Sequence, residues 1–228
     1  LAPLLADLRR DTGVELVMDY RGTMAATAEL NRGFDLAWLS TSRFLRLRDA
    51  EPQLTTSIML SPLVLGVKAG QAAKLGPQPT WADIADHAAA GELRDGMADP
   101  HVSGTGMAAL IGVATAAAGT GAALRPEDVR CDRIQGFLAG RAFDAPDVTE
   151  EYVRREHEVG GLVAPESAIL ALNASGRLRE PLEVVYPRDG IVLADYPLML
   201  VKPDKRAVYD RVVQWLRTPS AQRAIMDR

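Results

Sequence analysis

The feature that most constrains this chain is a recurring order of a short apolar run, a cluster of small polar residues, and a helical segment. The run Leu36–Leu39 precedes Ser40-Thr41-Ser42, the run Gly96–Ala98 precedes Ser103-Gly104-Thr105-Gly106, and Gly161–Val163 precedes Pro165. Runs this short suit strands, whereas the segments that follow have helical spacing. Strands alternating with helices predict the α/β class.

Applied along the whole chain, the same patterns give a set of expected elements. Helices are predicted over residues 1–10, 23–31, 40–48, 80–90, 103–118, 126–139, 150–158, 165–173, 204–217 and 219–227, and strands over 14–18, 36–39, 58–60, 63–67, 96–98, 161–163, 182–185 and 197–201. Thr80-Trp81-Ala82-Asp83 has the spacing of a capping box at a helix start. Residues 68–80 and the neighbourhood of Pro146 are expected to be surface connections.

Two units explain this order better than one. The β-rich stretches 58–67 and 182–201 bracket a middle segment that has its own strands and helices. We therefore expect a first lobe over residues 1–67 and 186–228 and a second lobe over residues 68–185. Each lobe is expected to hold a mostly parallel sheet flanked by helices, with two crossover strands joining the lobes.

Composition excludes several classes of function. The formal net charge is -4, with 26 Lys+Arg against 30 Asp+Glu, and no basic stripe is present, which argues against a nucleic-acid partner. Cys131 is the single cysteine, so an intramolecular disulfide and a cysteine-based zinc site are both excluded. The longest apolar stretches fall short of the ~20 residues that span a bilayer.

The sequence offers no constellation for catalysis or cofactor binding. The three histidines, His87, His101 and His157, have no metal-ligand spacing, so no metal site is predicted. Gly104-Thr105-Gly106 is followed neither by the lysine of a phosphate-binding loop nor by a full dinucleotide fingerprint. No nucleophile, base and orienting group assemble. We therefore expect a binding protein with no cofactor, not an enzyme.

Candidate ligand contacts lie where strands give way to helices. They are Gly22, Thr23, Ser40, Thr41, Ser103, Gly104, Thr105, Glu166 and Ser167. Unpaired amides and the positive end of the helix dipole make a helix N-terminus a site for small anions. The alternative is that these hydroxyls only cap their helices, which is the more frequent role of Ser and Thr at such positions.

Tyr186 and Tyr196 are expected near the second crossing between the lobes, either reaching a ligand with their hydroxyls or packing the hinge. Arg21, Arg43 and Arg188 are the candidate cations for an anionic ligand. Aromatic residues make up only 5% of the chain, so a small polar or anionic ligand is favoured over a sugar stacked on rings.

Taken together, Ala98-Asp99-Pro100, Ser103-Gly104-Thr105-Gly106, the stretch 61–67 and Tyr196–Leu200 give the chain a family resemblance. It resembles bacterial extracellular solute-binding proteins of the type 2 periplasmic-binding fold, most nearly the molybdate-type branch. More narrowly, residues 19–23, 60–62 and 186–190 are similar to actinobacterial proteins in which such a domain precedes a von Willebrand factor A domain.

The resemblance implies two α/β lobes that close on a small-molecule ligand held in the cleft between them. By position, Gly22, Thr23, Ser40 and Thr41 would be first-lobe contacts, Ser103, Gly104, Thr105, Glu166 and Ser167 second-lobe contacts, and Tyr186 a hinge contact. Family members open with a strand that contributes a further hydroxyl, and this chain is expected to start after it, as the core of a longer protein. Glu166 departs from the pattern, because an acid there disfavours an oxyanion such as molybdate.

The same resemblance implies a monomeric, extracellular domain, secreted or tethered to the membrane surface, that delivers its ligand to a membrane permease of the ABC type. The rival interpretation is a ligand-sensing or protein-interaction module of a surface protein that carries the von Willebrand factor A domain.

Overall fold

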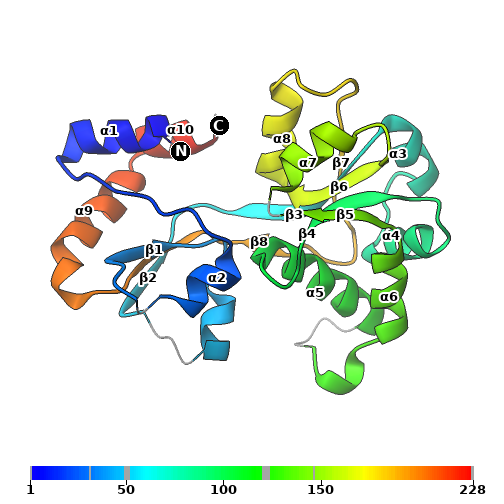
Figure 1. Ribbon diagram of the computed structural model, residues 1–228, viewed down its shortest axis with the longest axis horizontal. Coiled ribbons are helices and arrows are strands. Elements are labelled where there is room, and N and C mark those ends of the chain that lie inside the picture. Colours follow the sequence, from blue (N-terminus) through cyan, green and yellow to red (C-terminus); the bar gives the residue numbers. More distant parts are fainter. Residues whose placement is uncertain (1, 31, 49–51, 120–123, 146, 227–228) are drawn as a thin grey trace. The chain divides into compact units, whose positions relative to one another are not determined.

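The computed structural model describes residues 2–30, 32–48, 52–119, 124–145 and 147–226. The chain divides into two compact units, which are shown together in Figure 1 and are described separately below. Unit 1 holds Leu1–Leu60 and Asp195–Arg228, and unit 2 holds Ser61–Ala194, so the chain crosses between the units twice.

Unit 1 contains a three-stranded sheet with helices on both faces. Its elements are α1 (Ala2–Thr12), α2 (Thr23–Ala28), β1 (Leu36–Trp38), the 3-10 helix η1 (Arg43–Arg48), β2 (Leu54–Ser57), β9 (Pro197–Leu200), η3 (Pro203–Lys205), α9 (Arg206–Leu216) and α10 (Pro219–Met226). β9 lies between β1 and β2 and runs antiparallel to both. One face of the sheet packs on α1 and α9, and Met199 points to the other face, toward Leu30 and Leu45.

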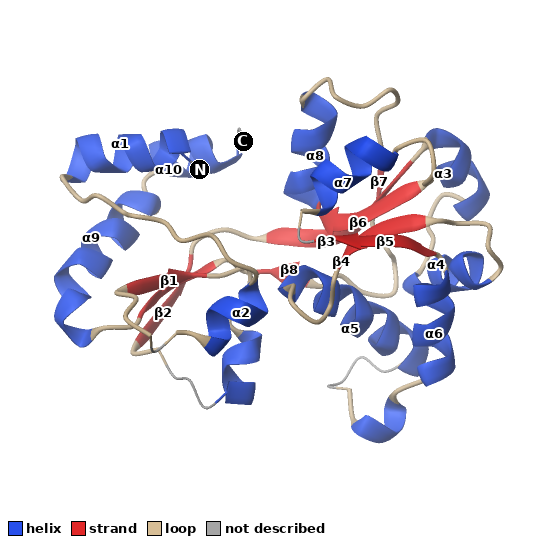
Figure 2. Ribbon diagram, in the orientation of Figure 1, coloured by secondary structure: helices blue, strands red, loops and turns tan. Residues whose placement is uncertain are grey.

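Unit 2 contains the larger sheet, in the order β5-β4-β6-β3-β7, with β8 pairing the start of β3. Its elements are β3 (Ser61–Val67), α3 (Ala69–Leu75), α4 (Trp81–Ala89), β4 (Asp95–Ala98), α5 (Gly104–Ala118), η2 (Pro126–Asp128), α6 (Cys131–Ala139), β5 (Arg141–Ala145), α7 (Val148–Arg155), β6 (Gly161–Pro165), α8 (Glu166–Ala174), β7 (Glu183–Val185) and β8 (Leu193–Ala194). Helices cover both faces of this sheet, with α4, α5 and α6 on one side and α7 and α8 on the other (Figure 2).

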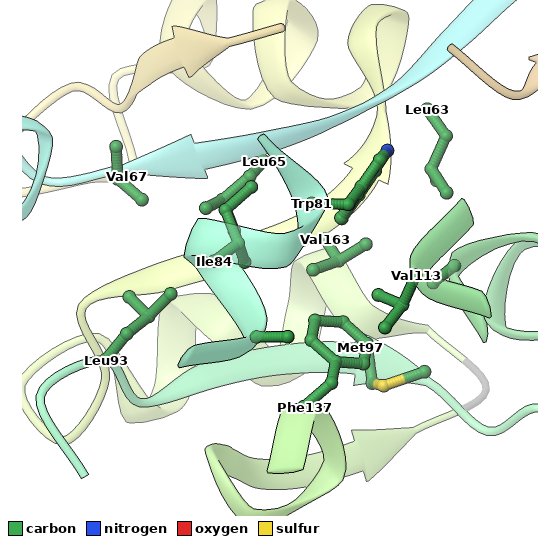
Figure 3. Close-up of a cluster of buried hydrophobic side chains, with 12 residues drawn as sticks. Leu63, Leu65, Val67, Trp81, Ile84, Leu93, Met97, Val113, Phe137 and Val163 are labelled. Atoms are coloured by element: carbon green, nitrogen blue, oxygen red, sulfur yellow. The ribbon is translucent and has the colours of Figure 1, made fainter. Parts of the chain in front are cut away.

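β3 divides its side chains between the two cores of unit 2. Leu63, Leu65 and Val67 point into the core under α4, α5 and α6, whereas Val64 points into the core under α7 and α8. Figure 3 shows the first core, where Trp81 of α4 meets Phe137 of α6 edge to face with ring centroids 6.2 Å apart. A strand covered on both faces reads as a continuous apolar run, which is why this stretch stands out in the sequence.

The mixed α/β class and the two units agree with expectation, but the strand directions do not. β4 runs parallel to β5 and β6, whereas β3 runs antiparallel to β6, β7 and β8, and the sheet of unit 1 is antiparallel throughout. The expectation of mostly parallel sheets was therefore wrong. Its physical reason is that β3 and β9 each enter their unit directly after a crossing, not through a strand–helix–strand connection.

The division also differs from the expected boundaries at 67/68 and 185/186. All of 61–67 is one strand of unit 2, because it pairs with β6, β7 and β8. The segment 186–194 stays in unit 2 for the same reason, since Leu193 and Ala194 pair with Pro62 and Ser61.

Several predicted elements are confirmed and others are wrong. The capping box at Thr80 is present, with Asp83 N donating to Thr80 Oγ1 at 3.0 Å and Thr80 N donating to Asp83 Oδ2 at 2.8 Å. The strands predicted over 14–18 and 58–60 are absent, while α3, β2, β5 and β8 were not predicted. The predicted helix ends at Leu1, Asn31 and Asp227 and the loop residue Pro146 lie outside the described residues.

A buried acid at the start of β4 gives the fold an expected dependence on pH. Asp95 is 1% exposed, and neither carboxylate oxygen has a hydrogen-bond partner in the described structure. Burial raises the pKa of Asp95 to about 7, although the nearby Arg141 opposes the rise. Because the folded state holds this proton more tightly than the unfolded chain, Asp95 favours folding at low pH, and that contribution is lost as the pH rises from about 4 to about 7.

We predict that Asp95→Asn flattens this dependence, since the amide stays neutral at every pH. The variant should gain stability over the wild type as the pH rises, by on the order of 4 kcal/mol above pH 7. Urea denaturation between about pH 4 and 8 measures the difference. The exposed Asp204 provides the control Asp204→Asn, and equal pH slopes for the wild type and Asp95→Asn would contradict the prediction.

Candidate functional site

In unit 1, the predicted residues gather where β1 ends. Thr23 opens α2 and is 8% exposed, and its Oγ1 lies 2.7 Å from Ser40 Oγ, which follows β1. Thr41 is buried as well, and its Oγ1 accepts from Arg43 N at 3.3 Å. Gly22 is the N-cap of α2 and offers no side-chain cap. The structure thus brings Thr23 and Ser40 into contact across 17 residues of sequence.

The backbone of Tyr196 bonds the residues at the end of β1, a contact that was not predicted from the sequence. Its φ of 35° lies in the left-handed region that side chains with a Cβ disfavour. Tyr196 N donates to Ser40 O at 3.2 Å, and Tyr196 O accepts from Trp38 Nε1 at 3.0 Å. These bonds hold the strained residue against the end of β1, and the burial of its ring raises the pKa of the Tyr196 phenol.

In unit 2, the predicted residues lie along one edge of the sheet. β4 and β6 run parallel, so their carboxyl ends meet at the same edge, where α5 and α8 begin. β3 starts at this edge and β7 ends there, because both run antiparallel to their neighbours as the register Leu63↔Pro165 and Leu65↔Val185 shows. We call this line of Ser61, Ser103, Thr105, Glu166, Ser167 and Tyr186 the carboxyl edge.

Hydroxyl groups at the carboxyl edge cap the helices that begin there. Ser103 Oγ accepts from Thr105 N at 3.2 Å and from Gly106 N at 3.4 Å, at the start of α5. Ser167 N donates to Ser61 Oγ at 3.2 Å, and the two serine hydroxyls are also 3.2 Å apart. Capping, the alternative kept open for Ser103, is therefore what this side chain does in the structure. Gly104 lies buried behind it.

Ser61 is a member of this edge that the site prediction missed. It is 4% exposed and bonds both the amide and the hydroxyl of Ser167. Its only sequence signal is a polar residue at the start of an apolar strand, and its partner lies 106 residues away. The spacing of residues in the sequence cannot predict a contact between residues so far apart.

Glu166 and Tyr186 form a pair at the same edge. The Tyr186 hydroxyl donates a hydrogen bond to Glu166 Oε1, and this bond raises the pKa of the Tyr186 phenol, with burial and the carboxylate charge adding to it. Tyr186 itself follows β7 inside unit 2, and the second crossing of the chain falls at 194/195. The second crossing therefore lies beyond Tyr186, because β8 adds to β3 before the chain leaves the unit, and the role of Tyr186 as a hinge contact stays a prediction.

Two of the three candidate arginines contact other residues of the chain. Arg21 bonds Asp19 at 2.7 Å, pairs with Glu29, and lies 5.5 Å from the centroid of the Phe34 ring. Arg188 N donates to Pro79 O at 3.0 Å, and its charge helps to lower the pKa of Asp83, after the larger effect of the Thr80 hydrogen bonds. Arg43 is exposed on η1.

Among the described residues, no group of His, Cys, Asp and Glu side chains is suited to hold a metal ion. Nor does that part of the chain contain a helix with the length and apolar character required to cross a membrane.

Comparison with known proteins identifies the family. The sequence model of the family described as bacterial extracellular solute-binding protein matches residues 1–228. The chain therefore belongs to this family, whose fold is a two-lobed α/β fold. A search of curated proteins finds no significant match.

Solved structures agree at the level of the fold. The sulfate-binding protein SubI from Mycobacterium tuberculosis is 17% identical with a TM-score of 0.73, covering 97% of this chain and 78% of that one. A periplasmic thiamin binding protein is 11% identical with a TM-score of 0.73, covering 98% and 75%. A protein described as a two-component system protein that mediates signal transduction is 16% identical with a TM-score of 0.74, covering 99% and 80%.

The carboxyl edge makes one glycine indispensable. A Cβ at Gly106 would lie 2.1 Å from Ala98 O and 2.8 Å from Pro100 N, both backbone atoms. This glycine lets the first turn of α5 approach the chain that leaves β4, so its close contact is with the protein's own backbone.

We predict that Gly106→Ala destabilises the fold by roughly 1–3 kcal/mol or more, the scale of overpacking, because backbone atoms cannot rotate away from the new methyl group. Gly70→Ala is the control, since Gly70 is helical in α3 and a Cβ there meets nothing within 4 Å. Urea denaturation compares the two variants. Equal unfolding free energies for the two variants would contradict the prediction and show that α5 can move to make room for the methyl group.

Proposed function

We propose that this chain is a solute-binding domain that captures a small polar or anionic solute without chemical change and delivers it to a membrane permease. The match of the whole chain to the solute-binding family carries the proposal. The two sets of polar residues described above, around Thr23 and Ser40 in unit 1 and along the carboxyl edge of unit 2, are the contacts that we propose for the solute.

The proposed location is extracellular, secreted or tethered at the membrane surface, in keeping with the family's description. The molybdate-type branch, the monomeric state and the fusion to a von Willebrand factor A domain stay predictions.

A second candidate is a sensing role, in which the bound solute is reported to an attached domain. The structural likeness to a protein described as mediating signal transduction favours it, at the level of fold alone. The two candidates differ in their surroundings: a permease encoded beside this chain supports uptake, and an in-frame signalling or adhesion domain supports sensing.

Binding is tested by thermal unfolding against oxyanions, carboxylates, amino acids and small sugars, one class at a time. A specific solute at 100 times its Kd should stabilise the protein by roughly 2.7 kcal/mol, which is visible as a rise in Tm. Failure of every class would contradict a solute-binding role.

For a solute that binds, we predict that Ser103→Ala combined with Thr105→Ala weakens binding, while the unfolding free energy falls by only about 1–2 kcal/mol because one cap is lost. Ser175→Ala is the matched control, because its Oγ donates to Leu172 O at 2.6 Å at the opposite end of α8. Titration calorimetry on the folded variants gives the affinities. An unchanged affinity in the double variant would remove α5 from the site.

A further inference from the structure

Glu166 places a carboxylate at the carboxyl edge of unit 2. It is the first residue of α8, immediately after β6, and is partly exposed. In the described part of the chain the Tyr186 hydroxyl bonds one of its oxygens, and no ion pair involves it. One carboxylate oxygen therefore remains for another donor.

Some of the amides that could attract an anion are bonded to side chains within unit 2. Ser103 Oγ accepts from the first-turn amides of α5, and Ser61 Oγ accepts from that of Ser167 in α8. At the start of α7, Asp147 Oδ1 accepts from Thr149 N and Glu150 N, each at 3.1 Å. Each of the three helices that follow β4, β5 and β6 therefore has at least one first-turn amide bonded to a side chain of the chain itself.

Acidic residues follow the three parallel strands of unit 2, and the arginines Arg141 and Arg177 lie near two of these acids, Asp99 and Asp147. Asp99, Asp147 and Glu166 follow β4, β5 and β6, so each of these parallel strands delivers a carboxylate to the same edge. Asp99 Oδ1 accepts from the backbone N and the ring Nδ1 of His101, each at 2.9 Å. These hydrogen bonds from His101 lower the pKa of Asp99, so it stays ionised.

A dianion at this edge would meet the negative charge of Glu166, and the capped amides of α5 and α8 would not be free to bond it. A positively charged group that donates hydrogen bonds could instead bond the free oxygen of Glu166. Such a charge-assisted hydrogen bond is stronger than one between neutral groups. An unfavourable charge is also a means of rejecting the wrong solute.

We infer that the solute presents a cationic hydrogen-bond donor, such as a protonated nitrogen, to Glu166, with Tyr186 holding the carboxylate in place. The inference rests on the proposed function and narrows its ligand class. It selects cationic or zwitterionic solutes over sulfate-like dianions.

The test is titration calorimetry of the whole chain with six probes: lysine, arginine and spermidine as cations with protonated nitrogens, and sulfate, phosphate and molybdate as oxyanions. We expect at least one nitrogen cation to bind and every oxyanion to bind more weakly. Glu166→Gln should then lower the affinity for that cation by roughly tenfold or more, because a charged hydrogen-bond partner is lost.

Glu183→Gln is the matched control, because Glu183 is an exposed acid at the opposite end of β7, paired in register with Val67. It removes the same charge and should leave the affinity unchanged. Glu166→Asp, which keeps the carboxylate, should recover part of the affinity. Tyr186→Phe provides a second variant if Glu166→Gln does not fold, and it should lower the affinity for the cation by a smaller factor.

The outcomes separate the two claims. An oxyanion that binds the wild type more tightly than every cation overturns the inference and leaves solute binding standing. The inference is also overturned if Glu166→Gln leaves the affinity for the cation unchanged, or if Glu183→Gln lowers that affinity by the same factor. Absence of binding by all six probes, together with failure of the wider screen, contradicts the proposed function itself.

Discussion

The pairing of β3 is the interaction on which unit 2 depends. Val64, Leu65 and Val67 are each 0% exposed, and β6, β7 and β8 all pair with this one strand. Because its side chains alternate between the two cores, a shift of register by one residue would exchange them. Gly66 contributes to the fit, since a Cβ there would lie 2.9 Å from Ile169 Cδ1. The strand also starts with Ser61, so the constraint that builds the core fixes one residue of the carboxyl edge.

The polar residues of the carboxyl edge have a structural role in the fold, and we propose that they also bind the solute. Their first role is to satisfy the amides that each new helix leaves unpaired, which the fold requires at every strand-to-helix junction. Amides that are capped in this way are less available to an anion, and under our inference the selectivity of the edge depends on the side chains that remain, above all Glu166 and Tyr186.

Local signals predicted many of the helices and strands well. The capping box at Thr80 and the N-cap at Ser103 are both formed by residues within three positions of each other, so sequence spacing determines their geometry. The strand expected over 14–18 is wrong although its burial alternates as a strand's does, because a strand also needs a hydrogen-bonding neighbour, which no local pattern supplies. β5 was missed because Arg141 and Asp144 interrupt its apolar character.

The sequence by itself determined the α/β class, the presence of two units and the polar residues that follow the strands, because each of these depends on periodicity or on contacts within a few residues. Only the tertiary structure decided the strand directions, the unit boundaries and the partners of the site residues. Thr23 meets Ser40, Ser61 meets Ser167, and Tyr186 meets Glu166 across 17, 106 and 20 residues. Such contacts follow from sheet register and helix packing, which involve the whole unit and leave no mark on any short segment of the chain.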